Sequence, residues 1–241
     1  MPPARTSARL AALLLLLFAL PHACREASAQ TSLWTVPTAE VLEEGESYLE
    51  FDFDAKPAAY REGGFQSYGV FFVHGARRRM EVGVNAYFTK DGAGSEPLEL
   101  QSNVKYRFYE NEDAGVQAAA GGILYAPTGR GGGDTLGSAY AVVSKTVPRL
   151  RGAQFTGGGY ALLGQERGAG GRGGALFGYY QPLRRRLSFI ADWNTGRNRF
   201  GYAAAGFGLA LSKRGTLYSA YYFGNQGRGN NSLGVYYGLN F

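Results

Sequence analysis

The sequence contains few of the residues used in covalent, redox or metal chemistry. It has one cysteine, Cys24, along with two histidines and two methionines in 241 residues. Cys24 precedes Ala27-Ser28-Ala29, which has the A-x-A form of a signal-peptidase site. Cleavage there leaves a chain that begins at Gln30 and has no cysteine, so we expect no disulfide or thiol chemistry. No segment after residue 29 reaches 18 apolar residues, so no transmembrane helix is predicted.

The first 29 residues have the organisation of a secretory signal peptide. Arg5 and Arg9 form a positively charged n-region, and residues 10–20 are an uninterrupted apolar run. That apolar run is too short to cross a bilayer core of about 30 Å, which takes roughly 20 residues. We therefore predict that residues 1–29 are removed on export. The alternatives are an uncleaved membrane anchor and a lipid attached to Cys24, although the three residues before Cys24 match the lipidation pattern poorly.

The composition of the chain after residue 29 is typical of strands that are apolar on one face only. Removing the signal takes away three arginines and one glutamate, which lowers the formal net charge from +6 to +4. The basic residues are scattered through predicted turns, whereas nucleic-acid binding needs a concentrated basic face, so we expect no nucleic-acid partner. All 37 glycines and 17 tyrosines follow residue 29, and the mean hydropathy is −0.22. Strands that are apolar on one side only have such averages.

Residues 98–109 show the clearest alternation. In LELQSNVKYRFY the apolar and small residues occupy every other position, and charged or amide residues fill most positions between them. Successive side chains of a strand point to opposite faces, whereas a helix would spread these charges around its circumference. The pattern therefore predicts a strand with one apolar and one polar face.

The same pattern recurs along the chain from residue 47. Longer glycine-rich connections, such as 90–94, alternate with short basic ones, such as 76–78 and 184–186. Bacterial outer-membrane barrels have an even number of strands, short periplasmic turns and longer outer loops. The predicted strands are 47–55, 65–74, 79–89, 98–109, 115–126, 135–147, 153–164, 173–181, 187–194, 200–211, 215–224 and 232–241.

These strands predict an all-β fold: a transmembrane up-and-down antiparallel β-barrel over residues 47–241, with about 12 strands and with 10 to 14 as alternatives. A soluble β-sandwich also alternates, but its core favours Val, Ile and Leu. Here aromatic residues gather at strand ends, as in the interfacial girdles of membrane barrels. Residues 30–46 are expected to form a periplasmic lead-in or a small plug.

The last strand ends in an aromatic residue, Phe241, preceded by alternating apolar residues. This ending resembles the signal by which outer-membrane barrels are handed to their assembly machinery. The resemblance implies two partners, the barrel assembly machinery and outer-membrane lipid. The signal often has a glycine five residues from the end, where this chain has Tyr236.

Charged residues on the strands are expected to face the lumen, because Lys or Arg on the lipid face costs about 2–4 kcal/mol at the midplane. Lys105 and Arg107 therefore point inward, and antiparallel pairing places Glu81 opposite Arg107, or opposite Lys105 if the register shifts by two. Tyr109 is expected on the same wall. The predicted lumen-lining residues are Glu50, Asp52, Asp54, Glu81, Asn85, Glu99, Gln101, Asn103, Lys105, Arg107 and Gln117.

The predicted barrel carries no recognisable enzyme site. His22 lies in the signal, so His74 is the only histidine left, and no nucleophile stands at a recognisable spacing beside it. Asp134 and Asp192 lack a paired carboxylate. Residues 129–133 are glycine-rich but open no helix, so they do not predict a phosphate site. We expect no catalytic residues, no metal and no cofactor.

The middle of the chain resembles a known family. Val104-Lys105-Tyr106-Arg107-Phe108, the strand ending at 125–129, and Leu136-Gly137-Ser138 are similar to the outer-membrane family labelled "MetA-pathway of phenol degradation" over residues 98–165. The resemblance implies a β-barrel that transports small, often aromatic compounds. Residues 36–42 also resemble the lead-in of many such barrels.

Two uses of the lumen follow from the sequence. In one, a narrow polar path in the outer membrane passes or binds a small solute selected by charge and shape. In the other, the inward charges pair and seal a structural or adhesive barrel. Eight strands give an interior filled by side chains and sixteen give an open channel, so a count of twelve does not decide between them.

Overall fold

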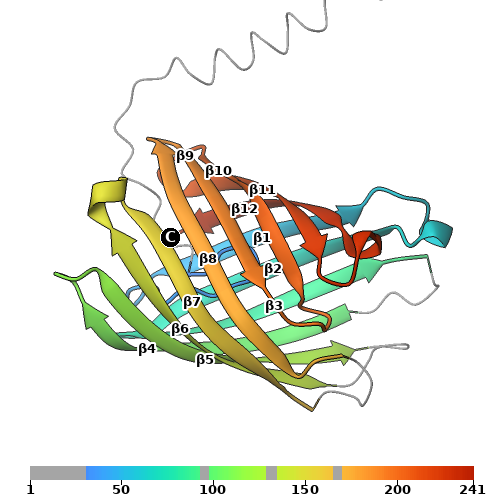
Figure 1. The fold of residues 1–241 in the computed structure, drawn as a ribbon, viewed down its shortest axis with the longest axis horizontal. Coiled ribbons are helices and arrows are strands. Elements are labelled where there is room, and N and C mark those ends of the chain that lie inside the picture. Colours follow the sequence, from blue (N-terminus) through green and yellow to red (C-terminus); the bar gives the residue numbers. More distant parts are fainter. Residues whose placement is uncertain (1–30, 93–97, 129–134, 165–169) are drawn as a thin grey trace, which may run out of the picture.

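The computed structural model describes residues 31–92, 98–128, 135–164 and 170–241. In these residues twelve strands pair in sequence order and close into one antiparallel barrel (Figure 1). The strands are β1 Ser47–Lys56, β2 Phe65–Arg77, β3 Met80–Lys90, β4 Leu98–Asn111, β5 Val116–Thr128, β6 Leu136–Val147, β7 Ala153–Leu163, β8 Gly173–Arg184, β9 Leu187–Asn194, β10 Tyr202–Ala210, β11 Gly215–Gly224 and β12 Ser232–Asn240.

Three short 3-10 helices, η1 (Tyr60–Glu62), η2 (Pro148–Leu150) and η3 (Arg228–Asn230), lie in the connections. None of the helices in the described residues is long and apolar enough to cross a membrane. The predicted signal peptide lies outside the described residues.

The predicted fold class is confirmed, and each predicted strand is present with ends that differ by no more than three residues. The largest differences are in β2 and β8, which both continue past their expected ends. Each contains a register irregularity, between Gly75 and Arg77 in β2 and between Pro182 and Arg184 in β8. An extra residue at such a bulge lets pairing resume, so the strand extends into the turn.

The barrel closes between its first and last strands. β1 pairs with β12 over the register Tyr48↔Asn240 to Ala55↔Leu233. Beyond that register, Ser47 N donates to Phe241 O at 2.8 Å, and Phe241 N donates to Ser47 O at 3.0 Å. Closure leaves no unpaired sheet edge, which is the condition for a sheet to span lipid.

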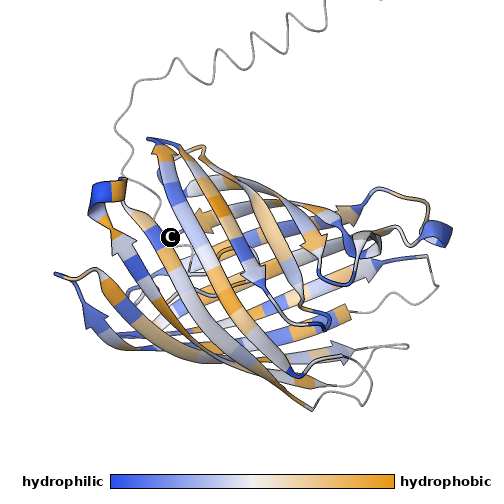
Figure 2. Cartoon of the chain, viewed as in Figure 1, coloured by the Kyte–Doolittle hydropathy of each residue, from blue (hydrophilic) through white to orange (hydrophobic). Residues whose placement is uncertain are grey.

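The two faces of the wall differ in polarity. Along β1, Phe51 is 48% exposed on the outside, while Asp52 is 8% exposed on the inside. Hydrophobic and hydrophilic residues alternate in this way along most strands (Figure 2). Lys145 is a charged residue on the outer face, but it lies at the end of β6 opposite Val116, where its ammonium donates to Ala114 O.

A bulge in β4 changes one sequence prediction. The β4–β5 register shifts between Arg107 and Tyr109, so Phe108 and Tyr109 are both exposed, at 54% and 47%. Tyr109 therefore faces outward, contrary to expectation. The bulge instead turns Glu110 inward, where its Oε2 lies 3.1 Å from Arg107 Nη2.

The apolar outer face predicts a position-dependent effect of charge. Val84 is 60% exposed on the outer face of β3, so Val84→Arg would place a charge in lipid and lower the free energy of unfolding by about 2–4 kcal/mol. The measurement is guanidinium unfolding in phospholipid bilayers. Leu150→Arg, at a half-exposed position in η2, is the matched control and should have little effect. Equal effects of the two substitutions would contradict the lipid-facing assignment.

Candidate functional site

Residues 31–46, the luminal segment, precede β1; residues 31–42 lie in the barrel lumen, and the exposed residues 43–46 form the turn that leads into β1. The first part of the segment forms a small hairpin, in which Leu33 N donates to Val36 O at 2.8 Å and Thr38 N donates to Thr31 O at 3.1 Å. A bridge between Ser32 and Pro37 completes the hairpin. The sequence left a periplasmic lead-in and a plug as alternatives for this region; in the structure the segment lies against the inner wall.

Every third residue of the luminal segment packs into the wall. Leu33, Val36, Ala39 and Leu42 are between 0% and 5% exposed. Leu33 belongs to an apolar cluster with residues of β9–β12, Val36 and Ala39 to a second cluster with β5, β6 and β8, and Leu42 to a third with β1 and β2. The segment therefore supplies much of the hydrophobic core of the barrel. This spacing of three is visible in the sequence, but it matches the period of neither a strand nor a helix and so predicted no packing.

The wall makes room for the luminal segment with small residues. A Cβ atom built on Gly178 of β8 would lie 2.3 Å from Leu33 Cδ1, closer than any real contact. Ala119 and Ala204, which are 0% and 3% exposed, also face the segment's clusters. Small side chains at these inward positions allow the segment's backbone to approach the strands.

Buried polar side chains of the wall satisfy the backbone of the luminal segment. Asp192 Oδ2 accepts hydrogen bonds from Thr35 N at 2.6 Å and Val36 N at 2.8 Å. Ser144 Oγ accepts one from Ala39 N at 2.9 Å. Unpaired buried amides cost free energy, so these two side chains fix the segment's position. Asp192 showed no pattern in the sequence because its partners are more than 150 residues away.

An ion pair of the wall holds the luminal segment at Thr31 and at Leu42. Glu81 is directly opposite Lys105 across β3 and β4, the second of the two registers expected, and Lys105 Nζ lies 2.9 Å from Glu81 Oε1. Lys105 Nζ also donates to Thr31 O at 2.6 Å, and Glu81 Oε2 accepts from Leu42 N at 3.0 Å. Both side chains are almost fully buried.

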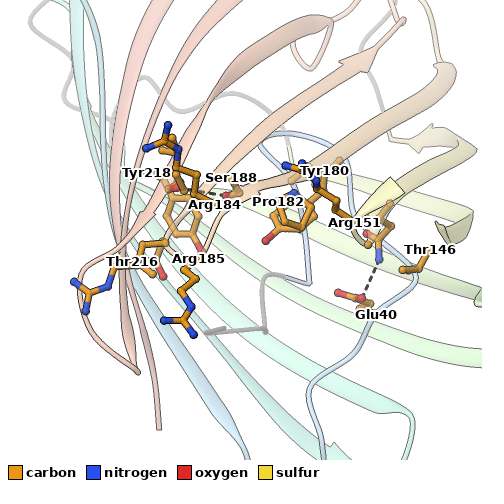
Figure 3. A pocket seen from close by; sticks show the side chains of 17 residues that line it. Glu40, Thr146, Arg151, Tyr180, Pro182, Arg184, Arg185, Ser188, Thr216 and Tyr218 are labelled. Carbon is orange, nitrogen blue, oxygen red and sulfur yellow. Dashed lines mark hydrogen bonds between the residues drawn. The ribbon is translucent and has the colours of Figure 1, made fainter. Parts of the chain in front are cut away.

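Glu40 of the luminal segment faces the β6–β7 end of the wall (Figure 3), where its Oε1 accepts a hydrogen bond from Gln154 Nε2 at 2.9 Å. Burial raises the pKa of Glu40, while Gln154, Lys105 and Arg107 oppose the rise. A carboxyl whose pKa rises on folding favours the folded state most strongly below its usual pKa, and this contribution is lost as pH increases.

The remaining predicted lining residues form hydrogen-bonded chains along the inner wall. Asn85 Nδ2 donates to Gln101 Oε1 at 3.1 Å, and Gln101 Nε2 donates to Glu99 Oε1 at 2.9 Å. Gln117 Nε2 donates to Glu110 Oε1 at 3.0 Å. Asn103 lies beside Gly83 of β3. Glu50, Asp52 and Asp54 follow one another along the inside of β1 and face a cavity.

The luminal segment separates two cavities. The first, the outer cavity, has a volume of 650 Å³ and lies toward the end of the barrel where β1 ends and β2 begins. The second, the inner cavity, has a volume of 280 Å³ and lies toward the opposite end, beside the Arg184–Arg186 turn (Figure 3). Leu33 lines both cavities.

A loop between β9 and β10 reaches across the outer cavity. Arg199 Nη2 lies 2.8 Å and 2.6 Å from the two carboxylate oxygens of Glu99, which is on β4 at the other side of the ring. The neighbouring Phe200 ring packs on Tyr125 with centroids 4.8 Å apart. This contact could not be predicted from the sequence, because a single arginine in a loop has no periodicity.

His74 has a partner that the sequence did not reveal. Ser47 is directly opposite His74 across β1 and β2, and Ser47 Oγ lies 2.9 Å from His74 Nδ1. Alternation places both side chains on the outer face, because their neighbours Tyr48 and Val73 belong to an inner cluster. Within the described ranges no carboxylate hydrogen-bonds to His74, whereas a catalytic triad has such a group. Those ranges also contain no group of three or more His, Cys, Asp or Glu placed to hold a metal.

Comparison with solved structures identifies the fold but not the substrate. The barrel is similar to the KdgM porin (TM-score 0.59, 6% identity, covering 80% of this chain and 98% of that chain). It is also similar to the KdgM porin in complex with disordered oligogalacturonate (0.55, 7%, 81% and 98%) and to an outer-membrane channel from Pseudomonas putida F1 (0.50, 12%, 84% and 98%). No family model and no curated protein matches the chain.

The buried ion pair predicts a strongly non-additive pair of substitutions. Lys105→Met alone leaves the Glu81 carboxylate buried without a cation, which should lower the free energy of unfolding by about 3–5 kcal/mol. The double variant Glu81→Leu/Lys105→Met removes both charges and should recover much of that loss. Denaturant unfolding of both variants in lipid measures the difference. Additive losses would show that the two side chains are not coupled.

Proposed function

We propose that the protein is an outer-membrane channel for a small solute, and that the luminal segment controls passage. The barrel fold, the similarity to porins and channels of that fold and the predicted signal peptide support the location. The single observation that carries the proposal is the pair of cavities that approach from opposite ends and meet at Leu33. Moving the hairpin of the luminal segment would join them.

The way the luminal segment is held supports conditional passage. Residues 31–42 contact the wall through an apolar face and hydrogen bonds to a few side chains, including the paired Glu81 and Lys105. Backbone pairing to the wall is confined to Gly45 and Glu46, which bond to Gly75 of β2. Segments held in this way open at lower free energy than the strands of a sheet. The sealed structural or adhesive barrel is the alternative. It would have the same contacts but would pass no current.

The solute is proposed to be small and to include an apolar or aromatic part. The sequence resemblance to the "MetA-pathway of phenol degradation" family supports this size and chemistry, as do the aromatic residues around the outer cavity. The luminal segment leaves space for a small molecule in each cavity but not for a wide, water-filled pore.

Leu33 is the residue to change when testing this channel. Leu33→Ala shortens the side chain that separates the two cavities, so the single-channel current in planar lipid bilayers should increase severalfold over that of the unaltered protein. Leu150→Ala, in η2 outside the lumen, is the matched control and should leave the current unchanged. Absence of current from both the unaltered protein and Leu33→Ala would favour the sealed barrel.

A second candidate function rests on the Ser47–His74 contact at the outer face. A serine activated by a histidine beside lipid could hydrolyse a lipid ester, although no carboxylate among the described residues hydrogen-bonds to the ring. We expect phospholipid hydrolysis by the purified protein to be at background and unaffected by His74→Ala. A measurable activity that both His74→Ala and Ser47→Ala abolish would establish the enzyme instead.

A further inference from the structure

We propose that one sector of the outer wall binds the headgroups of anionic phospholipids at the end of the barrel that has the short turns. The sector, called the basic sector here, runs over β7 to β10 and includes the turns 148–152, 183–186 and 211–214. Its exposed side chains form three layers: a row of aromatic rings, a set of leucines and a group of cations. Binding at this surface does not depend on whether the lumen conducts.

Four aromatic rings form a continuous row across the four strands. The Phe155 ring of β7 packs on Tyr179 of β8 with centroids 5.0 Å apart. Tyr179 is followed by Phe189 of β9 at 6.3 Å, and Phe189 by Phe207 of β10 at 5.6 Å. Ile190, next to Phe189, is 0% exposed inside the barrel, so alternation places the row on the outer face. Rows of this kind lie where the membrane meets water.

Three leucines are exposed between the aromatic row and the tips of the turns. Leu150 lies in η2, Leu183 near the end of β8 and Leu211 directly after β10. They are 50%, 38% and 45% exposed. A single exposed leucine is ordinary on a protein surface, but these three recur in the three turns of one sector. Acyl chains at the level of the aromatic row would cover them.

The same three turns contain seven cations and no acidic residue. The cations are Arg149, Arg151, Arg184, Arg185, Arg186, Lys213 and Arg214. Among the described residues, no carboxylate oxygen lies within 4.0 Å of the side-chain nitrogens of Arg149, Lys213 or Arg214. The turn between β4 and β5 contains Glu112 and Asp113 instead, so the positive charge is not spread evenly around the ring.

The combination of leucines and cations fits a phospholipid surface. Arginine and lysine can lay their apolar stems along acyl chains while the charged group reaches the headgroup, and a guanidinium can bind two phosphate oxygens at once. Lipids with a net negative charge attract such clusters, whereas the ammonium of a zwitterionic lipid offsets its phosphate. A soluble acidic partner would use the cations but leave the leucines in water. The partner is therefore an anionic phospholipid within the bilayer.

The test compares two spin-labelled lipids, phosphatidylglycerol and phosphatidylcholine, which share their acyl chains and differ in headgroup charge. With the protein in phosphatidylcholine bilayers, electron paramagnetic resonance measures how much of each label is motionally restricted at the barrel surface. The association constant of phosphatidylglycerol should be higher by about twofold or more, since the value averages over all lipids around the barrel and one sector carries the charge. Salt at about 1 M shortens the screening length to about 3 Å and should remove most of the difference.

The variant Arg149→Gln/Lys213→Gln/Arg214→Gln removes cations of the basic sector that do not line the inner cavity. It should bring the ratio of the two association constants toward one. The matched control, Arg61→Gln/Lys90→Gln/Arg197→Gln, removes the same charges from exposed positions at the other end of the barrel and should leave the ratio unchanged. Migration as folded barrels on unheated gels checks both variants.

Equal association constants for the two lipids in the unaltered protein would overturn the proposal, as would equal losses of preference in the two variants. The salt response needs no variant, so a preference that persists at 1 M salt would overturn the proposal even if a variant failed to fold. Displacement of phosphatidylglycerol by inorganic phosphate at constant ionic strength would also overturn it, because the site would then be one for free phosphate.

Discussion

Closure of the strand ring is the constraint on which the other features of this protein depend. Lipid offers no hydrogen bonds to backbone groups, so the sheet must pair its first strand with its last. The contacts between Ser47 and Phe241 extend that pairing to the end of the chain. Once the ring is closed, the alternation along each strand assigns one face to lipid and the other to the lumen.

A ring of twelve strands encloses more space than the inward side chains fill, since eight strands already give a filled interior. The luminal segment fills the space that the inward side chains leave. It packs Leu33, Val36, Ala39 and Leu42 against the wall, and its amides are satisfied by Asp192 and other inward polar groups. The inward charges therefore have two uses: they anchor the segment through Glu81 and Lys105, and they shape the cavities on either side.

The two cavities differ in the charge that lines them. Carboxylates of β1 and aromatic rings line the outer cavity, while Arg151 and the arginines of the β8–β9 turn line the inner cavity. This difference arises from a single chain whose basic residues are concentrated in the short turns. The lining of the lumen is therefore acidic and aromatic on one side of the luminal segment and rich in arginine on the other.

The sequence by itself determined the strands, their approximate ends and which side chains of a strand lie on the same face, because alternation with period two is a local property of the chain. It also limited Glu81 to two partners. Only the tertiary structure decided that Lys105 is that partner, that the bulge turns Tyr109 outward, and that residues 31–42 lie in the lumen. Asp192 with Val36, Glu99 with Arg199 and Ser47 with His74 meet only when the ring closes. Their separations along the chain, from 27 to 156 residues, leave no periodic signal, so register and closure had to bring them together.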